Sequence, residues 1–255
     1  VEFANAIVGR FSGGLALVAI IACIFFGAIS GSAVACVAAI GTILIPSMVR
    51  RGYDAPFSTA VQACAGTLGV MIPPSIPMII YGVMTGVTIG GLFMGGILPG
   101  IFVGASLMLV AWFIARKRGY KGDRRADAAH VWATFKDAIL ALLMPAIILG
   151  GIYGGVFTPT EAAVVAVVYG FVIGFFVYRE LRIRDLKGIL VNSVVGTAMI
   201  MFIIATSSVF SWILTAQKIP QSVAEAILSF SRNPVVVMFL INVLLLFIGT
   251  FMETV

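Results

Sequence analysis

Three long segments without a charged residue constrain this chain more than any other feature. They cover Phe11–Val49, Ala55–Ala115 and Gly188–Gln217, with 39, 61 and 30 residues. A helix needs about 20 apolar residues to cross a bilayer. The composition agrees, because 61% of the residues are hydrophobic and 10% are charged, whereas soluble domains have about 45–50% and about 25%. The sequence therefore predicts an all-α polytopic membrane protein.

Basic residues form short clusters between the apolar segments. The chain has 16 Lys and Arg against 10 Asp and Glu, a net charge of +6. Such clusters are typical of cytoplasmic loops rather than of a nucleic-acid-binding surface. Every basic residue except Lys218 and Arg232 can be placed in the cytoplasm by one consistent topology. We expect no nucleic-acid partner.

The first charge-free segment predicts a hairpin. Ser30–Ser32 separates an arm over Phe11–Ile29 from an arm over Ala33–Val49, and Arg10 and Arg50 flank the two outer ends. Both ends are therefore expected on the cytoplasmic face. The turn must then lie within the membrane, where irregular backbone is tolerated only if it is buried or lines a watery cavity.

The second charge-free segment predicts a broken helix. Pro73, Pro74 and Pro77 remove backbone donors and follow a glycine-containing stretch, so a continuous helix is excluded there. We expect two half-helices around an unwound centre at Thr67–Met71, and a return crossing over Gly96–Ala115.

The rest of the chain predicts further crossings and two amphipathic stretches. Thr158 and Glu161 have the spacing of a capping box, which we favour over a functional role for Glu161. The expected elements are an interfacial helix over Arg125–Lys136, crossings over Ala138–Val156, Thr158–Tyr178 and Gly188–Gln217, an outer stretch over Lys218–Arg232, and a re-entrant segment over Pro234–Met252.

Two weak similarities suggest an internal repeat. Ala4–Val8 resembles Ala224–Leu228 at an offset of 220 residues, and Phe26–Ser32 aligns with Ile248–Thr254 at an offset of 222. Five predicted crossings separate the two copies, so the second enters the membrane from the opposite face. Inverted repeats with broken helices are a recurring plan of secondary transporters.

The hairpin turn carries the strongest candidate chemistry. Ser30 and Ser32 offer hydroxyls and the turn offers free carbonyls, which are oxygen ligands suited to sodium. Close helix packing by small residues is the alternative. Glu253 lies at the predicted tip of the second hairpin. There it either contacts an ion or the substrate, or caps a helix. A serine hydrolase would need a base. The apolar segments contain neither histidine nor lysine, and only Glu161 and Glu253 could serve as one, so an enzyme is not expected.

The cysteines and the histidine indicate neither a metal centre nor a disulfide. Cys23, Cys36 and Cys64 are odd in number and lie in apolar segments without metal-ligand spacing. His130 falls in a charged loop, where solvation explains it.

Several motifs resemble the large membrane subunit of TRAP transporters, the tripartite ATP-independent periplasmic systems. The similarity runs along essentially the whole chain in order and spacing. The motifs are Phe26–Ala35 (FGAISGSAVA), Ala38–Gly41 (AAIG), Arg51–Asp54 (RGYD), Ile72–Ser75 (IPPS), Gly154–Ala163 (GGVFTPTEAA) and Phe251–Glu253 (FME).

The resemblance implies sodium-coupled import of organic acids such as C4-dicarboxylates or sialic acid by an elevator mechanism, in a bacterial inner membrane. It implies a small membrane subunit and a periplasmic substrate-binding protein as partners, and Na⁺ as the coupling ion without a covalent cofactor. A sodium/carboxylate symporter or antiporter that needs no binding protein is the alternative.

Site residues also follow from the resemblance, by position. Many relatives have Asp where this chain has Cys36 or Glu253. Cys36 lacks the acidic group and is left out of the site, whereas Glu253 keeps the charge on a longer side chain. A first sodium site comprises Ser30, Gly31, Ser32, Thr67, Gly69 and Met71; part of a second comprises Gly249, Thr250, Met252 and Glu253; the substrate cavity comprises Ser32, Pro73, Pro74 and Ser75.

Three parts are expected along the chain. Residues 1–95 hold the first hairpin and broken helix of a transport domain, 96–187 hold scaffold helices with a basic loop, and 188–255 begin the second repeat. The second hairpin breaks off at Val255, so we expect the chain to be a fragment.

Overall fold

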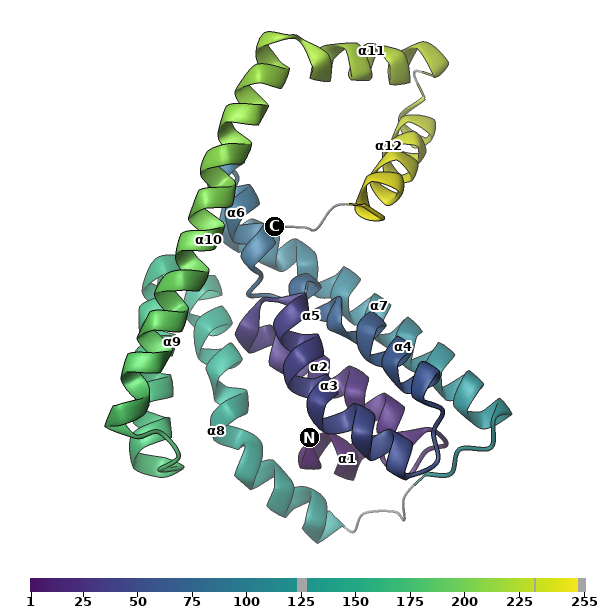
Figure 1. Cartoon of the computed structure of the whole chain (residues 1–255), viewed down its shortest axis with the longest axis vertical. Helices are drawn as coiled ribbons and strands as arrows, with labels where there is room; N and C mark the ends of the chain where they lie inside the picture. Colours follow the sequence, from purple (N-terminus) through teal and green to yellow (C-terminus); the bar gives the residue numbers. More distant parts are fainter. Residues whose placement is uncertain (123–127, 232, 252–255) are drawn as a thin grey trace. The chain divides into compact units, whose positions relative to one another are not determined.

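The computed structural model describes residues 1–122, 128–231 and 233–251, and all regular elements in these ranges are helices (Figure 1). Six helical stretches are long and apolar enough to cross a membrane. The prediction of an all-α polytopic membrane protein is confirmed. The helices are α1 (Glu2–Val8), α2 (Gly14–Ser30), α3 (Ala33–Arg50), α4 (Ala55–Gly66), α5 (Leu68–Met71), α6 (Ile76–Thr85), α7 (Ile89–Lys117), α8 (Ala128–Tyr153), α9 (Pro159–Val172) with its π-helical continuation η1 (Ile173–Val177), α10 (Ile183–Ala216), α11 (Ile219–Phe230) and α12 (Pro234–Gly249).

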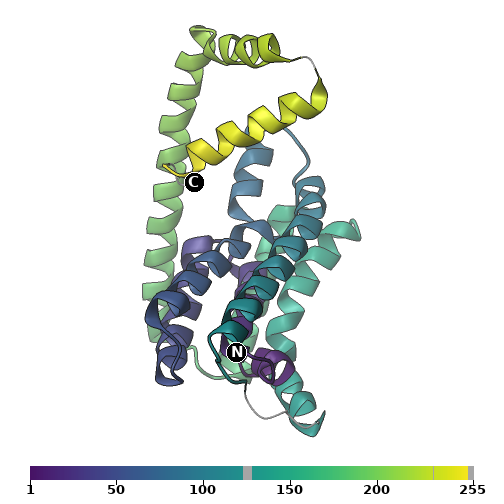
Figure 2. The ribbon, with the colours of Figure 1, turned by 90° about the vertical axis from the view of Figure 1, so that its right-hand side faces the viewer.

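The chain divides into two units, Val1–Glu180 and Leu181–Val255. Within the first unit, α2 is the central helix and packs against α1, α3, α4, α5 and α7 (Figure 1 and Figure 2). Val18, Ala19 and Cys23 of α2 are completely buried. A helix that is apolar on all sides belongs in the interior, which explains why this 17-residue helix is buried in protein.

The broken helix turns back earlier than predicted. Helix α6 ends at Thr85, Gly86 adopts a left-handed conformation with φ of 76°, and α7 begins at Ile89. The predicted start of the return at Gly96 was therefore wrong by about two helical turns. Gly86 allows the sharp reversal, because a side chain is strained at this φ.

The RGYD motif ties the start of α4 to the end of α7. Arg118 forms an ion pair with Asp54, and the backbone N–H of Asp54 donates to the Tyr120 hydroxyl at 3.0 Å. The Tyr53 ring stacks on Tyr120 with centroids 4.3 Å apart, and Arg118 lies over the Phe57 ring. Ion pair and aromatic contacts together fix the loop that follows the first hairpin.

Helix α8 replaces two predicted elements. It runs without a break from Ala128 to Tyr153, whereas a separate interfacial helix over Arg125–Lys136 and a crossing over Ala138–Val156 were predicted. Arg125 lies outside the described residues, but the break between Lys136 and Ala138 is absent. No glycine or proline occurs there to end the helix.

The predicted capping box at the start of α9 is confirmed. Thr158 Oγ1 accepts from the Glu161 N–H at 3.3 Å, and a Glu161 side-chain oxygen accepts from the Thr158 N–H at 2.8 Å. Pro159 occupies the first helical position, where its missing N–H costs no hydrogen bond. Glu161 therefore has a structural role in capping the N-terminus of α9.

The second unit repeats the element order of the start of the chain. Helices α2 and α12 begin 220 residues apart, at Gly14 and Pro234. With the same offset, the residues of α1 correspond to residues within α11. In both copies a short helix precedes a long apolar one. The agreement in spacing supports the internal repeat, and its inverted orientation stays a prediction.

Candidate functional site at the hairpin tip

The tip of the first hairpin is a two-residue turn between α2 and α3. Gly31 ends α2 in a left-handed conformation with φ of 64°, and its N–H donates to Gly27 O at 2.8 Å. Ser32 begins α3 as its N-cap, and its hydroxyl accepts from the Ala35 N–H at 3.3 Å. The Ser32 N–H lies 3.4 Å from Ser30 Oγ. The predicted hairpin, with its turn at Ser30–Ser32, is confirmed.

The broken helix touches this tip directly. The Ile76 N–H donates to the Gly31 carbonyl at 3.2 Å, which joins the start of α6 to the hairpin turn. A Cβ atom on Gly31 would lie 2.9 Å from Pro74 O, closer than real Cβ contacts. Glycine is therefore required at position 31 both for its φ and for this approach.

The unwound stretch covers Ile72–Ser75 and directly follows the predicted one. Leu68–Met71 form a helical turn, and Thr67 has helical dihedral angles of −62° and −24°. The helix is interrupted between Met71 and Ile76. The prediction of an unwound stretch over Thr67–Met71 was wrong because the missing N–H groups of Pro73 and Pro74 act at their own positions, whereas the earlier glycines tolerate a helix.

Gly69 brings the short helix α5 against the hairpin. A Cβ atom on Gly69 would lie 2.6 Å from Cys36 Sγ and 2.8 Å from Ser32 O. Gly27 on α2 faces it, because its own added Cβ would lie 2.7 Å from Gly69 Cα. These two glycines let three helices meet beside the Ser32 carbonyl.

Two residues of the predicted first sodium site point elsewhere. Thr67 is exposed, and its hydroxyl donates to Cys64 O at 2.8 Å at the C-terminal end of α4. The Met71 carbonyl faces α7, where a Cβ atom on Gly96 would lie 2.9 Å from it. The structure thus brings Ser30, Gly31, Ser32 and Gly69 together, and no contact of this kind joins Thr67 or Met71 to them in the described part of the chain.

A cavity of about 230 Å³ adjoins the tip. Its lining includes Ser30, Gly31, Pro74 and Ser75, and its opposite wall is apolar and comes from α7, α8 and α9. Ser75 is completely buried, and among the described residues its hydroxyl has no hydrogen-bond partner. Because a buried hydroxyl without a partner is costly, Ser75 is the candidate ligand-binding group of this cavity. Ser32 and Pro73 do not belong to this lining.

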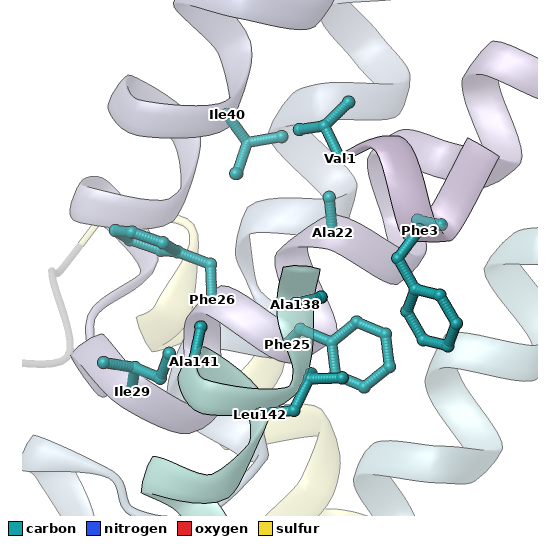
Figure 3. Close-up of a pocket in the computed structure, with 11 residues that line it drawn as sticks. Val1, Phe3, Ala22, Phe25, Phe26, Ile29, Ile40, Ala138, Ala141 and Leu142 are labelled. Carbon is teal, nitrogen blue, oxygen red and sulfur yellow. The ribbon is translucent and has the colours of Figure 1, made fainter. Parts of the chain in front are cut away.

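A second cavity that also borders the hairpin has a different character. It measures about 210 Å³ and lies between α1, α2, α3 and α8. Figure 3 shows only hydrophobic side chains around it, among them Phe3, Phe25 and Leu142. No side chain in this lining can orient a polar solute. We therefore centre the candidate site on the cavity at Ser75.

The predicted second sodium site is only partly described. Gly249 ends α12, and the Thr250 hydroxyl donates to Phe247 O at 2.7 Å. Met252 and Glu253 lie outside the described residues.

Sequence reasoning missed a buried polar cluster below the tip. Gln62 on α4 donates through Nε2 to Cys23 Sγ and to Cys36 O, both at 3.3 Å. Cys36 Sγ also lies 3.9 Å from Ser30 Oγ. The signal that could have found this cluster was Gln62 itself, an amide inside a 61-residue segment without charge.

Comparison with known proteins gives one family along the whole chain. The model of the family "Tripartite ATP-independent periplasmic transporter, DctM component" matches residues 1–255. The chain is 45% identical to the isethionate TRAP transporter permease DctMQ of Oleidesulfovibrio alaskensis, over 99% of the chain and 40% of that protein. It is 44% identical to the C4-dicarboxylate large permease DctM of Pseudomonas aeruginosa and 40% identical to the sialic acid large permease SiaM of Vibrio cholerae, each over 99% of the chain and 59% of the relative. The chain thus spans about half the length of these relatives.

Proposed function

Because the chain belongs to the DctM family of tripartite ATP-independent periplasmic transporters, we propose that the full-length protein imports an organic acid together with sodium. The family makes it a multi-pass transporter permease and not an enzyme. Glu161, one of two candidate bases of a hydrolase, is engaged in the capping box of α9. Relatives are named for C4-dicarboxylate, sialic acid and isethionate, which suggests a small organic anion as substrate.

The observation that carries the proposal is the contact between the hairpin tip and the broken helix. The Ile76 N–H binds the Gly31 carbonyl, and the unpartnered Ser75 hydroxyl lies beside this contact and lines the cavity. Ser75 is also the N-cap residue of the ten-residue helix α6. The helix dipole attracts anions to a helix N-terminus, and because the Ile76 N–H is bound to Gly31 and Pro77 has no N–H, we assign the Ser75 hydroxyl as the donor to the anion. The carboxylate of the substrate would bind here.

Sodium would bind on the hairpin side of the same contact. Ser30 and Ser32 provide hydroxyl oxygens, and the Ser32 carbonyl lies next to Gly69. Many secondary transporters coordinate sodium near the bilayer midplane through the carbonyl oxygens of unwound helix segments. Thr67 and Met71 would join the ligands only after their present contacts change. Gly249, Thr250, Met252 and Glu253 would form one side of a second sodium site in the second repeat.

Transport by an elevator mechanism requires a moving part and a fixed part. We assign residues 1–95 to the moving part, 96–187 to scaffold helices, and 188–255 to the start of the second repeat. Partners would be a small membrane subunit and a periplasmic binding protein that delivers the substrate, as the tripartite family name implies. The location would be a bacterial inner membrane.

Reconstituted uptake tests this proposal. The full-length permease and its small subunit are placed in proteoliposomes with an imposed sodium gradient, and uptake of labelled C4-dicarboxylate, sialic acid and isethionate is measured with and without the cognate binding protein. Uptake that requires both sodium and the binding protein is the expected result. Uptake with sodium alone would establish the symporter alternative, and sodium-independent uptake would refute the sodium assignment.

A further inference from the structure

Two thiols and one amide form a buried cluster directly below the hairpin tip. Cys23 on α2, Cys36 on α3 and Gln62 on α4 are 0%, 0% and 1% exposed. Gln62 Nε2 lies 3.3 Å from Cys23 Sγ, and Cys36 Sγ lies 3.6 Å from Cys23 O. The two thiols also interact with each other, and the Cys36 carbonyl accepts from Gln62 Nε2 at 3.3 Å. The two sulfur atoms are thus neighbours across the two arms of the hairpin.

This cluster is not explained by packing alone. Gln62 Oε1 is buried without a hydrogen-bond partner among the described residues, which costs free energy in an apolar interior. Cys36 Sγ also contacts the tip, because it lies 3.9 Å from Ser30 Oγ. It packs against α5 as well, where a Cβ atom on Gly69 would lie 2.6 Å from it. A chemical change at Cys36 would therefore reach the tip residue Ser30.

We propose that Cys23 and Cys36 are a redox modification site, at which a two-electron thiol oxidant converts the neighbouring thiols into a disulfide that joins α2 to α3. Both S–H bonds break and one S–S bond forms, while the two protons and two electrons pass to the oxidant, for example to the N=N bond of diamide. The partner thiol is adjacent, so the disulfide forms in preference to higher oxidation of either sulfur.

The disulfide would restrain the hairpin tip. It closes a loop from residue 23 to residue 36 that contains Ser30, Gly31 and Ser32, and such a loop loses conformational freedom. It also removes the Cys36 thiol from its contact with Ser30. The expected consequence for transport rests on the proposed sodium-coupled function, whereas the formation of the disulfide and its effect on hairpin dynamics do not.

Chymotryptic mapping tests the modification itself. Phe25 and Phe26 lie between the two cysteines, so cleavage there separates Cys23 from Cys36 unless a disulfide joins the fragments. The full-length permease with its small subunit is treated with diamide, denatured, alkylated and digested. We expect a joined pair of fragments that dithiothreitol separates. Fragments that carry alkylated Cys23 and Cys36 after oxidation would overturn the proposal.

Two further readouts test the consequence. Amide hydrogen exchange over residues 27–35 is expected to slow after oxidation, and the initial rate of sodium-driven uptake to fall about fivefold or more, with recovery after reduction. Cys23→Ser and Cys36→Ser should each abolish both effects, and Cys64→Ser, which changes the exposed cysteine, should retain them.

A disulfide that leaves hydrogen exchange unchanged would refute the restraint of the hairpin tip. Unchanged uptake despite slowed exchange would refute its role in transport, while absence of uptake in the reduced protein would count against the proposed function alone.

Discussion

The backbone N–H of Ile76 donates a 3.2 Å hydrogen bond to the carbonyl of Gly31, which joins the start of α6 to the turn between α2 and α3. The two residues are 45 positions apart in the sequence. Through this bond the proposed sodium ligands and the proposed substrate ligands share one backbone contact. Changes on either side of the contact should therefore affect binding on the other side.

Gly31→Ala should destabilise the protein and abolish uptake. The substitution places a side chain at a φ of 64° and puts its Cβ 2.9 Å from Pro74 O, so we expect a loss of about 1–3 kcal/mol. Thermal unfolding of the full-length complex in detergent measures the loss. Gly95→Ala on α7 is the control, because nothing lies within 4 Å of the added methyl group. Equal stability of the two variants would contradict the assigned turn geometry.

Ser32→Ala should weaken sodium dependence more than it weakens folding. Loss of the N-cap costs about 1 kcal/mol, whereas loss of a sodium ligand should raise the sodium concentration for half-maximal uptake about fivefold or more. Thr158→Ala is a matched control, since it removes another N-cap away from the tip. An unchanged sodium dependence in Ser32→Ala would exclude its hydroxyl from the site.

Ser75→Ala should separate binding from stability. The hydroxyl is buried without a partner in the described residues, so its removal should leave thermal stability unchanged or slightly higher. The KM for the organic acid should rise roughly tenfold or more, because a hydrogen bond to a charged group is worth about 1.5–3 kcal/mol. Ser106→Ala serves as control, because that hydroxyl is satisfied within α7. An unchanged KM would show that the Ser75 hydroxyl does not bind the anion.

Glu161→Ala should lower stability without changing the sodium dependence of uptake. The carboxylate accepts hydrogen bonds from the backbone and the hydroxyl of Thr158, so its loss should reduce the melting temperature by a few degrees. Glu161→Gln retains the capping box and should stay close to the unchanged protein. If Glu161→Gln instead changed the sodium dependence at normal stability, the carboxylate would belong to an ion site.

Features that depend on local sequence were predicted well. The turn at Ser30–Ser32 follows from a polar, glycine-containing interruption of an apolar segment, and the capping box at Thr158 follows from the spacing of Thr and Glu. The broken helix was expected from its prolines, but its unwound stretch was predicted at Thr67–Met71 and lies at Ile72–Ser75. Glycine and proline weaken a helix in different ways, and only proline removes the donor that ends it at a defined residue.

The sequence alone determined that the chain crosses a membrane, where its first hairpin turns, and which family its motifs resemble, because apolar length, turn residues and capping residues act within a few positions. Only the tertiary structure decided which residues meet. It brought Ile76 to Gly31 and gathered Cys23, Cys36 and Gln62 from three helices, and it turned Thr67 and Met71 away from the tip. The physical reason is that contacts between helices depend on their rotation and close approach, which the glycines at positions 27, 31 and 69 permit and no local pattern specifies.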